Sequence, residues 1–113
     1  MADGILYHNP RCSKSRQALE LLQAKGLSPQ VVDYLKTPPD AAMLKTLLGQ
    51  LGLSAKDVLR RKEAAEAGID MNASETALIT ALAEHPIALE RPIFAHKGKA
   101  VVGRPPEKVL EIL

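Results

Sequence analysis

Cysteine and aromatic residues are scarce in this sequence, and the single cysteine argues against two kinds of site. The 113 residues include one cysteine, no tryptophan and 3% aromatic residues. One cysteine cannot form an internal disulfide, which agrees with a reducing compartment. With no second cysteine and no histidine pair in HxxxH spacing, we also expect no metal site.

A strong charge of one sign and long apolar runs are lacking as well. The 15 Lys and Arg residues against 13 Asp and Glu residues leave a net charge of +2, which is too small to indicate a nucleic-acid or membrane partner. No apolar run approaches the roughly 20 residues of a membrane-spanning helix, and the start lacks the apolar core of a signal peptide. We therefore expect a cytoplasmic protein with a single domain over residues 1–113.

Hydrophobic patterning predicts a strand, a turn and a helix at the start of the chain. The apolar run at residues 4–8 is followed by an Asn-Pro turn. A helix then begins at Cys12 or Ser13 and ends at Gly26, a glycine stop. The β-branched run at 30–35 is the expected second strand, which completes a βαβ unit.

The rest of the chain predicts helices followed by a hairpin and a closing helix. In order, we expect a helix capped by Thr37, a short helix from Ser54, a polar surface excursion at 61–73, a helix capped by Asn72 or Ser74, an antiparallel hairpin at 91–103 and a closing helix at 105–113. A mixed four-stranded sheet flanked by helices packs these elements economically. The prediction is thus an α/β, thioredoxin-like fold with a helical insertion over about 37–86.

The position of Cys12 indicates a reactive thiol. It follows a strand and lies at the first turn of a helix, where free N–H groups and the helix dipole stabilise a thiolate. Arg11, Lys14 and Arg16 add positive charge nearby. Buried filler would gain nothing from these cations, so we interpret Cys12 as a nucleophile rather than as a core residue.

Two well-known cysteine chemistries do not fit the residues after Cys12. A CxxC dithiol oxidoreductase would need a second thiol where Ser15 stands. The CxxxxxR loop of a tyrosine phosphatase would need an arginine where Ala18 stands. A disulfide cycle within one chain is therefore impossible.

Several segments together resemble the glutaredoxin-coupled arsenate reductases, the ArsC family, and their shorter branch in particular. They are "YHNPRCSKSR" at 7–16, "VLRRKE" at 58–63, "AEHPIALERPIF" at 83–94 and "GKAVVGRPPEKVLEIL" at 98–113. The resemblance implies that Cys12 attacks arsenate and that Arg60, Arg91 and Arg104 bind the oxyanion. It also implies glutathione as a co-substrate and glutaredoxin as a partner, with no bound cofactor.

Three further residues have expected supporting roles. Pro92 matches the cis-proline that faces the active cysteine in thioredoxin-like folds, although sequence does not reveal cis geometry. His8 either helps to ionise Cys12 as an imidazolium or is a strand-end histidine bonded to backbone. Ser15 either donates a hydrogen bond to the thiolate or caps its own helix.

Two other functions stay open at this point. A monothiol oxidoreductase that acts on glutathione mixed disulfides would use the same single cysteine. The Spx-type regulators bind RNA polymerase through the same fold, but they commonly carry a CxxC motif that this chain lacks.

Overall fold

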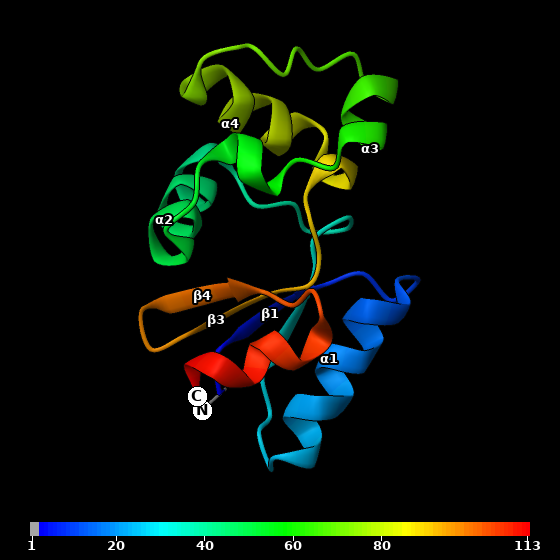
Figure 1. The fold of residues 1–113 in the computed structure, drawn as a ribbon, viewed down its shortest axis with the longest axis vertical. Helices are drawn as coiled ribbons and strands as arrows, with labels where there is room; N and C mark the ends of the chain where they lie inside the picture. The colour runs from blue at the N-terminus through cyan, green and yellow to red at the C-terminus, as the bar shows by residue number, and fades with distance from the viewer. Residues whose placement is uncertain (1–2) are drawn as a thin grey trace. The chain divides into compact units, whose positions relative to one another are not determined.

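The computed structural model describes residues 3–113 and divides into two compact units (Figure 1). The sheet unit comprises Met1–Thr37 and Arg91–Leu113, and the helical unit comprises Pro38–Glu90. The helical unit lies in the part of the chain where the insertion was expected. The single domain over 1–113 stays a prediction.

The sheet unit contains a mixed four-stranded sheet with the order β2-β1-β3-β4. Its strands are β1 (Ile5–His8), β2 (Gln30–Asp33), β3 (Ile93–His96) and β4 (Lys99–Val102). β1 pairs parallel with β2 and antiparallel with β3, and β3 and β4 form the expected antiparallel hairpin. β2 ends two residues before the predicted 35 because the Asp33 carboxylate accepts a hydrogen bond from the Leu35 backbone N–H and turns the chain.

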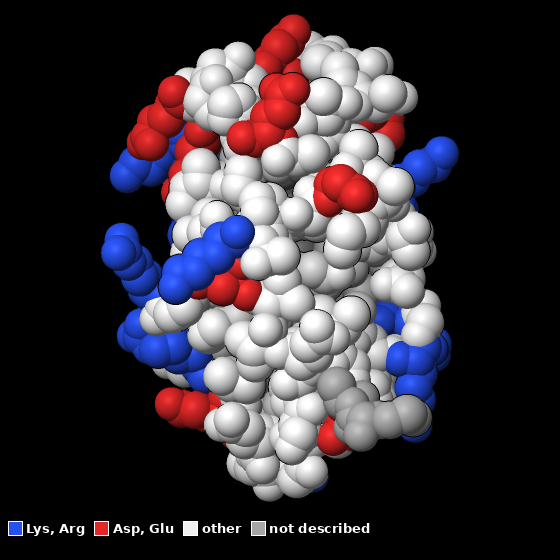
Figure 2. Space-filling view, turned by 180° about the vertical axis from the view of Figure 1, so that it is seen from behind, with Lys and Arg blue, Asp and Glu red and all other residues white. Residues whose placement is uncertain are grey.

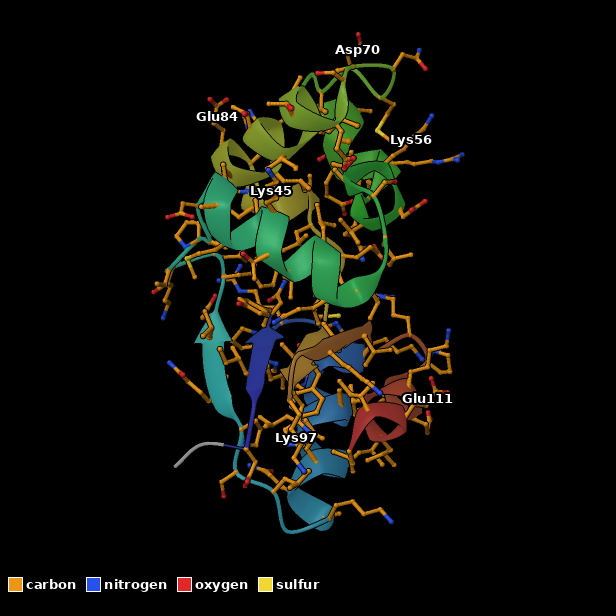
Figure 3. All side chains as sticks on the ribbon, turned by 90° about the vertical axis from the view of Figure 1, so that its left-hand side faces the viewer. Lys45, Lys56, Asp70, Glu84, Lys97 and Glu111 are labelled. Carbon is orange, nitrogen blue, oxygen red and sulfur yellow. The ribbon has the colours of Figure 1, made fainter. Side chains whose placement is uncertain are left out.

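One face of this sheet is covered by α1 (Ser13–Ala24) and the 3-10 helix η3 (Pro106–Ile112). Their side chains form a core cluster with the sheet, made up of Leu6, Ala18, Leu22, Phe94 and Val109. Glu111 of η3 points away from this cluster, as Figure 3 shows. The predicted extent of α1 is confirmed, with Cys12 as its N-cap residue.

The closing helix is a 3-10 helix rather than the expected α-helix. Residues Pro106, Val109 and Ile112 recur every third position, and the first two are buried while the third is half-buried. A 3-10 helix has three residues per turn, so this spacing aligns all three side chains along one side. Burial of that side against the sheet therefore favours the tighter helix.

The helical unit contains α2 (Ala41–Leu51), η1 (Ala55–Val58), α3 (Arg61–Glu66), α4 (Glu75–Glu84) and η2 (Pro86–Ala88). The buried leucines of α2 and α4 are Leu44, Leu47, Leu48, Leu78 and Leu82. The opposite faces of these helices carry exposed charged residues such as Lys45 and Glu84 (Figure 3). Leu44, Leu47 and Leu48 therefore form the buried face of α2.

One predicted helix start in this unit was wrong, and one helix was not predicted. α2 begins after Asp40, whose carboxylate accepts a hydrogen bond from Met43 N at 2.8 Å, and not after Thr37. The residues before Pro38 and Pro39 are biased to extended geometry, which delays the helix. Residues 61–66 form α3 within the segment expected as a polar surface excursion, because Ala64 is buried and Glu63 pairs with Arg60 in the first turn.

The start of α4 agrees with the predicted cap. Ser74, one of two candidate caps, accepts a hydrogen bond from Ala77 N at 3.2 Å. Within residues 3–113, no helix is long and apolar enough to span a membrane. On the face shown in Figure 2, basic and acidic side chains are interspersed with broad areas of other residues.

Candidate active site around Cys12

The loop between β1 and α1 is shaped by Asn9 and presents Cys12 at the helix start. Asn9 accepts hydrogen bonds from Cys12 N through its carbonyl oxygen and from Arg11 N through its side-chain oxygen, both at 3.0 Å. The Cys12 carbonyl oxygen accepts a hydrogen bond from Arg16 N at 3.0 Å, which is the first backbone hydrogen bond of α1. The Cys12 side chain thereby lies beside the unpaired N–H groups of the first helical turn.

The environment of Cys12 favours its thiolate. Burial raises the pKa of the thiol, but it is outweighed by the backbone N–H groups of Ser15 and Lys14, a hydrogen bond from the Arg91 side chain and the charge of Arg104. The pKa of Cys12 consequently lies below the ordinary value for a cysteine. A partly exposed thiolate of this kind is suited to nucleophilic attack.

Arg91 and Arg104 come from the two ends of the β3–β4 hairpin. Ile93 pairs with Val102 in this hairpin, and the pairing extends by one residue, where Gly103 N donates a hydrogen bond to Pro92 O at 2.8 Å. Arg91 and Arg104 each precede a proline in a cis peptide bond, so Pro92 has the cis geometry of the proline that it resembles. The hairpin therefore brings the two arginines together although they are thirteen positions apart in the sequence.

The Arg104 guanidinium forms hydrogen bonds with both Arg91 and Cys12. Its Nε donates to the Arg91 carbonyl oxygen at 2.8 Å, and its Nη2 donates to Cys12 Sγ at 3.5 Å. Gly103, just before it, has no space for a side chain, since a Cβ there would lie 2.8 Å from Pro92 Cγ. The close packing of the hairpin end thus fixes where the Arg104 guanidinium lies.

His8 and Ser15 form a buried pair next to the loop. His8 Nδ1 lies 2.6 Å from Ser15 Oγ, and Asn9 N donates to the same hydroxyl at 3.0 Å. Burial lowers the pKa of His8, Arg16 lowers it further, and Asp33 acts in the opposite direction. The lowered pKa of His8 favours its neutral form, and Ser15 faces the thiolate with its backbone N–H while its hydroxyl is bonded to His8.

Arg60 lies in the helical unit and is held by two carboxylates. Its Nε donates to Glu63 Oε2 and its Nη1 donates to Glu90 Oε1, each at 3.2 Å. The neighbouring Arg61 is exposed on α3. Sequence reasoning missed Glu63 and Glu90, although a carboxylate three positions after Arg60 in a helical segment is a recognisable signal for an ion pair.

The chemistry of the site is that of one thiol surrounded by cations. Within residues 3–113, no group of three or more His, Cys, Asp or Glu side chains is arranged to hold a metal ion. Guanidinium groups remain charged and donate paired hydrogen bonds to oxyanions. The arrangement of Cys12 with Arg91 and Arg104 can therefore bind a tetrahedral anion and attack its central atom.

Comparison with known proteins identifies the family. The model of the ArsC family matches residues 7–112. The chain belongs to the ArsC family. Among ArsC relatives, it is 52% identical over 112 residues to a protein named "Uncharacterized protein YfgD" of Escherichia coli strain K12, with 96% of this chain and 94% of that protein covered. It is 49% identical to a protein named arsenate reductase of Neisseria meningitidis serogroup B, with 96% of each covered.

Solved structures agree with the fold of this ArsC-family chain. A putative arsenate reductase from Yersinia pestis superposes with a TM-score of 0.91 at 48% identity, covering 96% of this chain and 99% of that one. An arsenate reductase from Vibrio cholerae gives a TM-score of 0.89 at 49% identity, with 96% of each chain covered. The predicted thioredoxin-like fold and the predicted family are thus confirmed.

Proposed function

We propose that this ArsC-family protein is an arsenate reductase with Cys12 as its nucleophile. The observation that carries the proposal is the Arg104 guanidinium, 3.5 Å from a Cys12 thiol whose pKa is lowered. Relatives at 49% identity that carry the name arsenate reductase support the choice of anion. Arg91 and Arg104 bind the arsenate oxygens beside the thiol, whereas oxyanion binding by Arg60 stays a prediction from the family resemblance.

In the first step, the Cys12 thiolate attacks the arsenic atom of arsenate. A sulfur–arsenic bond forms, an arsenic–oxygen bond breaks and the oxygen leaves as hydroxide, which is released as water once protonated. Arsenic remains in the +5 state in the resulting cysteinyl arsenate ester. The arginine charges stabilise this step because the developing negative charge lies on oxygens that they contact.

The reducing electrons come from external thiols, for which we propose glutathione. A second thiolate attacks a sulfur bound to arsenic, and the electron pair of the sulfur–arsenic bond stays with arsenic. Arsenic leaves as arsenite in the +3 state, and a disulfide with glutathione is left for glutaredoxin to reduce. The chain has one cysteine, so it cannot close this disulfide on itself.

A coupled assay tests the reaction directly. Purified protein is mixed with arsenate, glutathione, glutaredoxin, glutathione reductase and the reduced nicotinamide cofactor of that reductase. Oxidation of the cofactor is followed. We expect oxidation that depends on arsenate and is abolished by Cys12→Ser. Oxidation without arsenate, driven by a glutathionylated peptide, would instead support the monothiol oxidoreductase that the lowered pKa of Cys12 also favours. Absence of both activities would favour a binding role.

Anion protection tests the arginines. Arsenate bound beside Cys12 should slow the alkylation of the thiol by iodoacetamide. Arg104→Lys keeps the charge but loses the paired donors, so it should raise the half-protecting arsenate concentration by about tenfold. Arg61→Lys is the matched control because Arg61 is exposed and has no proposed role. Equal effects of the two variants would contradict the assignment of Arg104.

A further inference from the structure

The loop and the first helical turns around Cys12 carry positive charge without acidic neighbours in the sequence. Arg11, Lys14 and Arg16 lie within residues 8–19, a stretch that contains no Asp or Glu. All three side chains are exposed, and among residues 3–113 none of them forms an ion pair. An anion that approaches Cys12 along this part of the sheet unit therefore meets cations that no ion pair neutralises.

A hydrogen bond fixes the position of the Arg16 guanidinium. Nη1 of Arg16 donates to Pro10 O at 2.8 Å, so the side chain folds back from α1 over the loop that precedes Cys12. This direction is the usual one, because helical side chains point toward the helix N-terminus. The charge of Arg16 also lowers the pKa of His8, which agrees with a position beside the loop.

The other donors of Arg16 are available to a ligand. An arginine has five N–H donors, and the bond to Pro10 O uses one of them. In the part of the chain that the structure describes, no second hydrogen bond or ion pair engages this guanidinium. Because the bond to Pro10 O already restrains the side chain, an anion that binds it loses less rotamer entropy than one that fixes a freely moving arginine.

The groups proposed to bind arsenate come from another part of the sheet unit. Arg91 and Arg104 lie at the two ends of the β3–β4 hairpin, and Arg104 Nη2 donates to Cys12 Sγ. Arg16 is instead bonded to the loop on the N-terminal side of the cysteine. A second anionic group can therefore bind at Arg16 while the hairpin arginines hold the oxyanion.

We propose that Arg16 binds a carboxylate of glutathione and thereby favours this thiol over others at Cys12. At pH 7 glutathione carries two carboxylates and one ammonium group, so its net charge suits a cationic surface. A guanidinium and a carboxylate form paired hydrogen bonds, and Arg11 and Lys14 add charge nearby. The inference rests on the proposed function, in which glutathione supplies the reducing electrons.

The reaction of Cys12 with glutathione disulfide isolates this contact. The Cys12 thiolate attacks one sulfur of the disulfide, a new sulfur–sulfur bond forms to the cysteine, and one glutathione leaves as its thiolate. The uncharged bis(2-hydroxyethyl) disulfide reacts in the same way but has no carboxylate. The ratio of the two rate constants, measured by mass spectrometry of the adducts, reports the recognition of glutathione, because changes in the reactivity of the thiol affect both reactions.

Arg16→Gln should lower this rate ratio by about threefold, a loss typical of an exposed charged contact. Arg16→Lys keeps the charge but loses the paired donors, so it should lower the ratio by about twofold. Lys25→Gln removes an exposed cation at the other end of α1 and is the matched control, which should leave the ratio unchanged. If Arg16→Lys retains the wild-type ratio, general charge attraction explains the preference and the specific contact is overturned.

A measurement on the wild type does not depend on any substitution. S-methylglutathione keeps both carboxylates and has no free thiol, so it should slow the reaction of Cys12 with glutathione disulfide in a saturable way. Its dimethyl ester lacks the carboxylates and should slow the reaction far less. Equal inhibition by the two compounds, or inhibition by neither, would overturn the binding of a carboxylate at Arg16.

Arsenate protection separates this inference from the proposed function. If arsenate protects Cys12 from iodoacetamide but Arg16→Gln leaves the rate ratio unchanged, the Arg16 contact is overturned and the proposed arsenate reductase stands. If arsenate gives no protection but Arg16→Gln lowers the ratio, the Arg16 contact stands, the arsenate reductase fails and the monothiol oxidoreductase becomes the better function.

Discussion

Loss of the Arg104 charge should measurably raise the pKa of Cys12. Removing it by Arg104→Gln takes away a cation whose Nη2 lies 3.5 Å from the sulfur. Two unit charges at that distance attract by about 1.2 kcal/mol at the dielectric constant of bulk water, which suits a partly exposed pair and is a lower limit for a more buried one. Since 1.4 kcal/mol corresponds to a factor of ten, the thiolate fraction at a pH well below the midpoint should fall by about sevenfold.

The assay is an ultraviolet titration of the thiolate absorbance. The chain contains one cysteine, so the signal has a single source among thiols. Of the two tyrosines, Tyr7 has a pKa raised by burial, which keeps its own ionisation at higher pH. Direct absorbance is preferable to an alkylation rate here, because a thiolate of higher pKa is also intrinsically more nucleophilic and would partly hide the change.

A distant cation provides the control. Lys25 lies at the other end of α1, about 20 Å from Cys12 at a rise of 1.5 Å per residue, which exceeds the Debye length at physiological salt. Lys25→Gln should therefore leave the thiolate fraction unchanged. The electrostatic reasoning is refuted if Arg104→Gln leaves the midpoint of the Cys12 titration unchanged, or if Lys25→Gln shifts that midpoint equally.

Three further predictions concern stability. Gly4→Ala should destabilise the protein by about 1 to 3 kcal/mol in urea unfolding, because Gly4 has φ +86 and its Cβ would meet a carbonyl oxygen of β3, whereas Gly26→Ala at φ +80 meets open space and should cost less. Asp40→Ala should lower the free energy of unfolding by about 1 kcal/mol through loss of the α2 cap, as measured in the same way. Burial lowers the pKa of His8, so the unfolded chain binds the proton more readily, and thermal stability should be full above about pH 6.5 and fall as the pH drops through that value. His8→Asn, which keeps a polar group for Ser15 Oγ, should lose this part of the pH dependence, and an unchanged slope would place its origin elsewhere.

Local sequence patterns were sufficient for much of the fold. The strand, turn and helix around Cys12 follow from an apolar run, an Asn-Pro turn and a glycine stop, all of which act within a few residues. The β3–β4 hairpin was equally visible as two apolar runs around a glycine-containing turn. The 3-10 form of η3 was not visible, because it depends on burial of every third residue against a sheet formed elsewhere.

In the candidate site, too, some features follow from local sequence and others from tertiary packing. The sequence by itself determined that Cys12 lies at a helix N-terminus among cations and that it has no second thiol in the chain. Tertiary structure alone decided that Arg104 reaches Cys12, since hairpin pairing joins residues that local patterns treat separately. It also decided that burial lowers the pKa of His8, and that Arg60 rather than Arg61 is held by two carboxylates. Contacts between distant residues and the local dielectric environment arise when the chain packs, and no short-range pattern encodes them.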